Sequence, residues 1–213
     1  MQKNFYFSKK EALSYGWKEM KENFWIFAQI IIITLAIVGL TGILGDYFEK
    51  RSPINGVLWG VISIFIQFAV SAGIIAVILK IRETGKAKIK DILVDPKIIV
   101  RYIVASVIYS LIVIAGFILL IFPGFMWMMS YQMFQYLIID KKMKPLEALR
   151  ESKKITKGSR WNLFFFFIAA ALLNLAGMLA FGIGLFITIP VTAMAFVWIY
   201  KKLLEKNSSE MKK

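Results

Sequence analysis

Long apolar stretches alternate with short charged segments along almost the whole chain. Residues 24–45 and 57–79 each exceed the roughly 20 apolar residues that a helix needs to cross the hydrocarbon core of a bilayer. Two later stretches, residues 102–140 and 161–200, carry no charge before Asp140 and are interrupted by glycine and proline. We therefore predict an all-α integral membrane protein with six transmembrane helices. They are expected to form three hairpins, each preceded by a basic interfacial helix or segment.

Each of the two later stretches is expected to turn within or close to the outer leaflet. Proline is tolerated in the first turn of a returning helix, so the turns are predicted near Pro123 and between Gly182 and Gly184. A re-entrant pair that does not cross fully is the alternative for both stretches. The predicted spans are residues 24–45, 57–79, 102–122, 123–140, 161–181 and 184–200.

The remaining segments complete a single membrane domain over residues 1–204. Residues 46–56 carry charges and an Asn55-Gly56 turn signal, which predicts the only hydrated loop on the outer side. Residues 205–213 are short and polar, and we expect a disordered tail there.

Two charged segments are expected to form helices that lie along the membrane surface. Ser8 and Glu11 have the spacing of a capping box at the start of residues 8–23, and Leu13, Trp17, Met20 and Phe24 then follow at helical spacing on one face. This pattern predicts an amphipathic interfacial helix. Residues 145–156 have a weaker apolar face, and a solvated connector helix is the alternative there.

The two segments also share a sequence pattern. Each copy ends where an apolar stretch begins, which favours repeated units of interfacial helix plus hairpin. The alternative is a chance likeness, because any segment that enters a membrane needs basic residues and an interfacial tryptophan. The first copy is Glu11-Ala12-Leu13 with Lys18, Lys21 and Trp25, and the second is Glu147-Ala148-Leu149 with Lys154, Lys157 and Trp161.

Positive charge lies between the predicted hairpins. All but two of the 27 lysines and arginines flank them, and the net charge is +14. Cytoplasmic loops collect such residues, so we predict a multi-pass protein of the plasma (inner) membrane with both termini in the cytoplasm. Anionic headgroups attract each basic residue by about 1 kcal/mol, so the expected partners are membrane lipids and not nucleic acid. A membrane-protein partner or self-association is left open.

Basic and aromatic residues of the two interfacial segments are the candidates for contact with lipid headgroups. Tryptophan favours the depth of the headgroups, where its ring is apolar and its N–H stays hydrated. The candidate residues are Lys9, Lys10, Lys18, Lys21, Trp25, Lys154, Lys157, Arg160 and Trp161.

The sequence offers few groups for catalysis. It contains neither histidine nor cysteine, which excludes imidazole bases, thiolate nucleophiles and cysteine metal sites. The 13 carboxylates lie outside the apolar stretches or at their edges. They do not cluster as oxygen ligands, and the sequence has no glycine-rich phosphate loop. We expect a non-enzymatic protein with no metal and no cofactor.

Uncharged polar residues form rows inside the apolar stretches. The rows of residues 102–122 and 123–140 would both occupy the cytoplasmic half of an antiparallel hairpin, so they could meet in a polar cavity. The alternative is a set of hydrogen bonds between helices, worth on average about 0.6 kcal/mol each in membranes. A further row runs through Ser63, Gln67 and Ser71. The candidate residues are Ser106, Tyr109, Ser110, Tyr131, Gln132, Gln135 and Tyr136.

A set of short motifs spans most of the chain: Leu119 to Gly124, Asp140, Glu147-Ala148-Leu149, Ser152, Lys157-Gly158, Arg160-Trp161, Gly182-Ile183-Gly184, Pro190 and Tyr200. Together they resemble a bacterial family of multipass membrane domains. Such a domain precedes the catalytic domain in some glycerophosphodiester phosphodiesterases and also occurs in stand-alone proteins of unknown function. Because this chain has no histidine, it lacks the phosphodiesterase's catalytic apparatus. The resemblance therefore implies a fold and a membrane location rather than hydrolysis.

Two functional hypotheses follow. In the first, the protein organises lipid or a membrane partner through its basic cytoplasmic interfacial helices. The alternative is a facilitator or exporter of a small amphiphile, lipid fragment or peptide, which would use the polar rows.

Overall fold

The computed structural model describes residues 7–180 and 182–210. It is 88% helical and has no strand in this part of the chain, so the prediction of an all-α protein is confirmed. Within these residues, five helices are long and apolar enough to cross a bilayer. They are α2 (Phe24–Arg51), α3 (Pro53–Thr84), α4 (Pro96–Leu119), α8 (Arg160–Leu179) and α9 (Leu185–Glu210).

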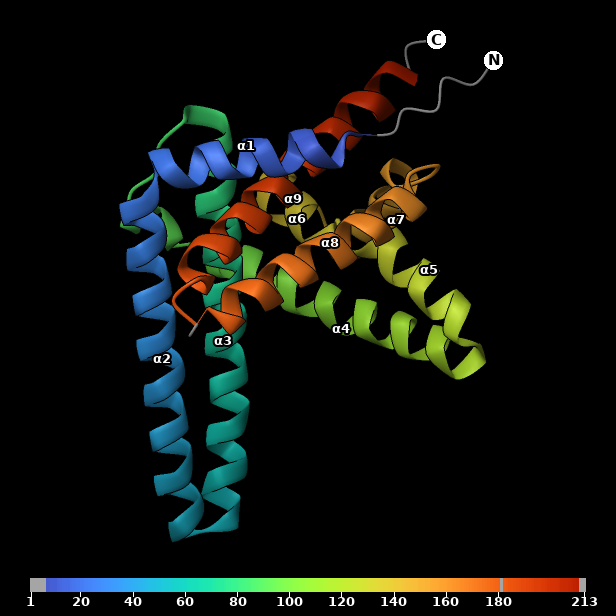
Figure 1. The fold of residues 1–213 in the computed structure, drawn as a ribbon. Helices are drawn as coiled ribbons and strands as arrows, with labels where there is room; N and C mark the ends of the chain where they lie inside the picture. The colour runs from blue at the N-terminus through green and yellow to red at the C-terminus, as the bar shows by residue number, and fades with distance from the viewer. Residues whose placement is uncertain (1–6, 181, 211–213) are drawn as a thin grey trace.

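Helices α2 and α3 run side by side and project away from the rest of the molecule (Figure 1). Ser52 alone links them, so residues 46–56, predicted as a hydrated loop, are almost entirely helical. Proline is well suited to the first position of α3, where no amide hydrogen is needed, and Pro53 occupies it. The indole of Trp59 donates to the carbonyl oxygen of Thr41 at 2.8 Å and joins the two helices near this tip.

The stretch predicted to hold the third and fourth spans contains three helices. Leu120 separates α4 from α5 (Ile121–Tyr131), and α6 (Phe134–Lys141) follows after a break at Gln132 and Met133. With 11 residues, α5 is too short to cross the hydrocarbon core alone. The predicted span of residues 123–140 is therefore interrupted, and its turn lies at Leu120, with Pro123 in the first turn of α5.

Helix α7 (Pro145–Ile155) satisfies the backbone groups that this break leaves without helical partners. The buried hydroxyl of Ser152 accepts the N–H of Met133 at 3.1 Å and donates to the carbonyl oxygen of Ser130 at 3.0 Å. The hydroxyl of Thr156 lies 3.0 Å from the same carbonyl. Residues 145–156 are thus packed along one face, and a fully solvated connector does not describe them.

Helix α1 (Lys9–Glu22) lies across the top of the bundle, against α9 (Figure 1). The hydroxyl of Ser8 caps it and accepts the N–H of Glu11 at 3.2 Å. The predicted apolar face included Leu13, Trp17, Met20 and Phe24, but Trp17 and Phe24 are exposed. Tertiary packing selects a rotated face instead, composed of Ala12, Gly16, Glu19 and Met20.

Gly16 explains why that face is chosen. A Cβ at this position would overlap the carbonyl oxygen of Val191 and lie 3.1 Å from its carbonyl carbon. Only the absence of a side chain lets α1 approach the backbone of α9 so closely. The helix that was predicted to be interfacial is therefore docked on α9.

The predicted internal repeat has a counterpart in burial. Seven buried positions between Ala12 and Ile30 each have a buried counterpart between Ala148 and Phe166. Each pair is separated by the same number of residues as the two copies of the sequence pattern, which favours a structural repeat over a chance likeness. The pairs are Ala12 with Ala148, Gly16 with Ser152, Glu19 with Ile155, Met20 with Thr156, Asn23 with Ser159, Phe27 with Leu163 and Ile30 with Phe166.

The last helices differ in length from their predicted spans. The span of residues 161–181 corresponds to α8, which ends at Leu179, and residue 181 lies outside the described residues. Helix α9 continues to Glu210, into the predicted disordered tail of residues 205–213. The amide of Asn207 donates to Glu151 of α7 at 2.9 Å and holds this extension against the bundle. Residues 211–213 lie outside the described part of the chain.

Candidate functional site

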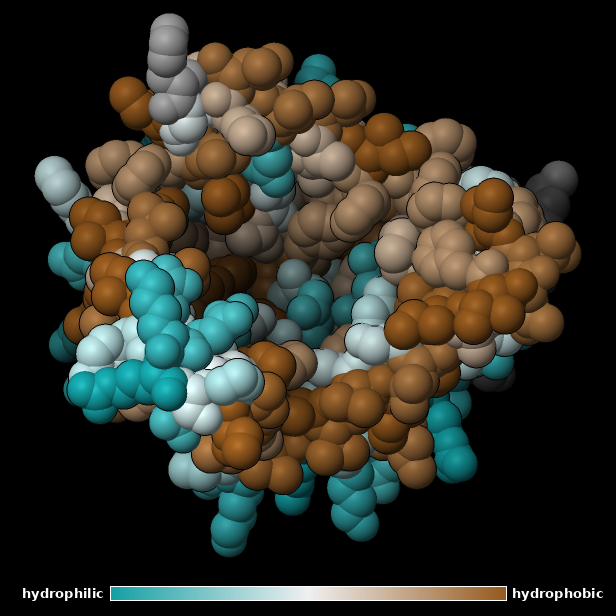
Figure 2. Space-filling view, turned by 90° about the horizontal axis from the view of Figure 1, so that it is seen from below, coloured by the Kyte–Doolittle hydropathy of each residue, from teal (hydrophilic) through white to brown (hydrophobic). Residues whose placement is uncertain are grey.

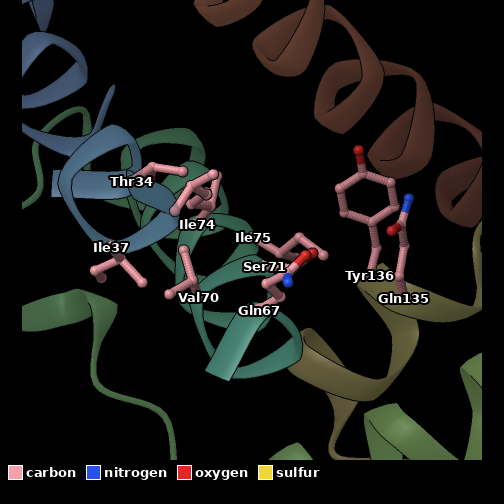
Figure 3. A pocket seen from close by; sticks show the side chains of 10 residues that line it. Thr34, Ile37, Gln67, Val70, Ser71, Ile74, Ile75, Gln135 and Tyr136 are labelled. Carbon is pink, nitrogen blue, oxygen red and sulfur yellow. The ribbon is translucent and has the colours of Figure 1, made fainter. Parts of the chain in front are cut away.

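A cavity of about 300 Å³ lies between α2, α3 and α6 (Figure 3). Seen from the side away from α1, the molecule is hollowed, with a hydrophobic rim around hydrophilic residues (Figure 2). The cavity wall mixes aliphatic side chains with amides and hydroxyls, and none of its residues is charged. The lining residues are Thr34, Ile37, Val38, Gln67, Val70, Ser71, Ile74, Ile75, Gln135 and Tyr136.

Two helices supply most of the polar wall. Gln67 and Ser71 are four residues apart on α3 and so lie one above the other on the same helix face. Gln135 and Tyr136 lie in the first turn of α6, directly after the break between α5 and α6. They stand across the cavity from Gln67 and Ser71 (Figure 3). The new start of the helix thus brings a second polar pair opposite the first.

Several polar groups in this cavity lack a protein partner. Ser71 and Tyr102 share a hydrogen bond of 3.0 Å between their hydroxyls, but the buried hydroxyl of Thr34 has none. The structure gives the side-chain amides of Gln67 and Gln135 no hydrogen bond to another described residue. A buried hydroxyl such as that of Thr34 is normally hydrogen-bonded, and the amides of exposed Gln67 and half-buried Gln135 are accessible, so this wall has donors and acceptors available for a ligand or for water.

A network of ionic and hydroxyl groups adjoins the cavity where Tyr136 lines it. The ring of Tyr136 stacks on that of Tyr200, with centroids 5.2 Å apart. The Tyr200 hydroxyl donates to Asp140 at 2.7 Å, and the ammonium of Lys201 lies 3.0 Å from both Asp140 and Glu83. The network therefore ties α3, α6 and α9 together beside the cavity.

The first three predicted site residues lie on α4, outside the cavity. Ser106 donates to the carbonyl oxygen of Tyr102 in its own helix at 2.8 Å, and Ser110 is exposed. The Tyr109 hydroxyl lies 3.4 Å from the carbonyl oxygen of Met128 on α5, and its ring packs on Phe134. A phenylalanine thus occupies the place opposite Tyr109 where the polar rows were expected to meet.

The other four predicted site residues divide between two environments. Tyr131 is half-buried beside the ammonium of Lys153, and the Gln132 amide lies 3.4 Å from the sulfur of Met129. Only Gln135 and Tyr136 enter the cavity. The break at Gln132 and Met133 separates Tyr131 on α5 from Gln135 and Tyr136 on α6.

Most candidate headgroup residues face outward. Lys9 and Arg160 are half-buried, and the other seven, Lys10, Lys18, Lys21, Trp25, Lys154, Lys157 and Trp161, are exposed. Trp25, at 77% exposure, and Trp161, at 49%, stand at the starts of α2 and α8. The ammonium of Lys9 lies 5.0 Å from the ring of Phe165 and so connects the start of α1 to α8.

Sequence reasoning found part of this site. It identified Gln67 and Ser71 as a polar row but did not combine them with Gln135, and it did not single out Thr34 or Lys201. The one available signal was Asp140, an ionisable residue at the end of an apolar stretch, which in a membrane protein is a default candidate for function. Its partners come from helices far away in the sequence.

The arrangement favours binding by hydrogen bonds and apolar contact. Within residues 7–180 and 182–210, no three histidine, cysteine, aspartate or glutamate residues gather in a way that could hold a metal ion. No family model, curated protein or solved structure matches this chain.

Proposed function

We propose that the chain is a non-enzymatic, multi-pass protein of the plasma membrane that organises lipid by holding an uncharged amphiphile in the cavity between α2, α3 and α6. The chemistry of the cavity wall carries this proposal. An amphiphile with an amide or hydroxyl headgroup matches the unpartnered groups of Thr34, Gln67 and Gln135, while its chain matches the aliphatic wall.

The size of the cavity limits what it holds. Its volume of about 300 Å³ equals roughly ten water molecules at about 30 Å³ each, which is the low end for ligand pockets. A headgroup and the first part of an acyl chain fit that space, and the rest of the chain would lie against the exposed apolar faces of α2 and α3. An ionised headgroup would be left without a counter-charge, because the wall is neutral.

The basic surface supports the membrane placement within this proposal. Both termini and the segments bearing α1 and α7 lie on the cytoplasmic side, where exposed Lys10, Lys18 and Lys154 meet anionic headgroups. The chain forms six spans in three hairpins, with α5 and α6 together making the fourth. The resemblance to the phosphodiesterase-associated membrane domains supports the same architecture.

Protection from a thiol reagent tests the proposed ligand. The chain has no native cysteine, so Gln135→Cys is a single probe in the cavity and Ser52→Cys is a control probe at the link between α2 and α3. Both variants are reconstituted in phosphatidylcholine nanodiscs and labelled with a water-soluble maleimide. Added monoolein, a neutral amphiphile with a hydroxyl headgroup, is expected to slow labelling at residue 135 and leave labelling at residue 52 unchanged.

The controls separate binding from a general effect on the bilayer. Oleate, with a charged headgroup and the same chain, is expected to protect residue 135 much less than monoolein does. Adding Gln67→Leu removes one headgroup partner and should weaken protection by monoolein. Equal protection at residues 135 and 52, or equal protection by the two amphiphiles, would contradict the proposal.

A further inference from the structure

Helix α6 carries both a wall of the cavity and the carboxylate of the adjoining ionic network. Tyr136 and Asp140 are four residues apart on it, so they share one helix face. Tyr136 lines the cavity, and Asp140 contacts Tyr200 and Lys201 of α9. A displacement of Asp140 would therefore displace the cavity wall.

The helix is interrupted at both ends of α6. Its start is the break at Gln132 and Met133, and its end is Lys142, whose φ of 53° lies in the left-handed region that costs most side chains energy. Short helices bounded by such positions can move by changes at a few backbone torsions. The eight residues of α6 thus form a short helical segment with an interruption at each end.

The contact between Asp140 and Lys201 is the most buried ionic contact of this segment. The side chain of Asp140 is 6% exposed and that of Lys201 is 18% exposed, whereas Glu83 is half exposed. Lys141 lies 3.7 Å from Asp140 but is itself half exposed. Removing one partner of a buried ion pair leaves the other charge buried without compensation, which is strongly unfavourable. The loss of Lys201 would therefore favour a movement of α6 that exposes the Asp140 carboxylate to solvent.

We infer that the Asp140–Lys201 pair is a latch that positions α6 and closes the cavity at its basic end, the end on which α1 and α7 lie. This inference rests on the proposed function, because the latch would regulate access to the same cavity. Lys201 and Asp140 are positioning residues, because neither lines the cavity and both act through Tyr136. Opening the latch would connect the cavity with the basic face of the membrane.

The test measures sided access to the cavity without any ligand. Gln135→Cys is labelled with a membrane-impermeant maleimide in intact cells and in inverted vesicles. Adding Lys201→Met is expected to raise labelling from the basic face several-fold and leave labelling from the opposite face unchanged. Because no amphiphile is added, this result is independent of whether monoolein protects the cavity.

A second substitution distinguishes a latch from a loss of folding. In the Lys201→Met background, Asp140→Asn removes the uncompensated charge. Labelling should then return toward the level of the Gln135→Cys protein in which Asp140 and Lys201 are unchanged. Glu83→Gln removes only the exposed partner and should change labelling little. Unchanged labelling in Lys201→Met, or an equal rise in Glu83→Gln, would overturn the inference.

One further variant applies if Lys201→Met does not fold. Tyr200→Phe removes the 2.7 Å hydrogen bond to Asp140 and keeps the ring that stacks on Tyr136. It is expected to raise labelling from the basic face by a smaller factor than full loss of the ion pair. Labelling no faster than in the unsubstituted latch would also overturn the inference.

Discussion

Ser152 stabilises the break between α5 and α6. Its removal should destabilise the protein, mainly because the backbone amide of Met133 loses its hydrogen-bond acceptor. In Ser152→Ala, the N–H of Met133 loses its acceptor at 3.1 Å and the carbonyl of Ser130 loses a donor at 3.0 Å. Ser152 and Met133 are both essentially inaccessible to solvent, so water cannot replace the lost partner without local opening.

The magnitude follows from which groups remain unsatisfied. Thr156 still reaches the carbonyl of Ser130 at 3.0 Å, so this acceptor keeps a partner. The amide of Met133 keeps none, and a buried unsatisfied donor costs about 1–3 kcal/mol. In Thr156→Val the carbonyl of Ser130 keeps Ser152, so we expect a cost below about 1 kcal/mol. The double variant should lose more free energy of unfolding than the sum of the two single losses, because the Ser130 carbonyl then loses both donors.

Unfolding of the purified protein by titration with a denaturing detergent measures these free energies. Ser110→Ala, which changes an exposed hydroxyl of α4, is the control and should be neutral. The reasoning is refuted if Ser152→Ala is as stable as this control. It is also refuted if Thr156→Val costs as much as Ser152→Ala, because the two hydroxyls would then be equivalent.

Two further predictions concern α1 and the membrane surface. Gly16→Ala forces a methyl group into the backbone of Val191 and should lower stability by roughly 1–3 kcal/mol through overpacking. Gly39→Ala, where a Cβ would have no neighbour within 4 Å, is the control and should be neutral or stabilising. Equal stability of the two variants in thermal unfolding in detergent would contradict close docking of α1 on α9. Reversal of Lys10, Lys18 and Lys21 to glutamate should weaken the binding of a peptide of residues 1–23 to vesicles that contain phosphatidylglycerol but not to pure phosphatidylcholine. A co-sedimentation measurement that finds no loss would remove the proposed electrostatic role.

Local sequence alone determined that the chain is helical and where its long apolar runs lie. A run such as residues 57–79 has no charged side chain, and only a helix satisfies its backbone hydrogen bonds within one segment. The Ser8 cap was equally predictable, because Ser8 and Glu11 lie three residues apart and the bond forms within one turn. These features depend only on near neighbours in the chain.

Tertiary structure decided which faces are buried and where the polar groups meet. The sequence of α1 permits either its predicted or its observed face, and the contact of Gly16 with Val191 selects the second. The carbonyl of Ser130 and the hydroxyl of Ser152 are partners across 22 residues, and Asp140 and Lys201 across 61. Periodicity reports which side of a helix is apolar, but not which helix it faces, so the cavity between α2, α3 and α6 and its latch could be found only from the packed structure.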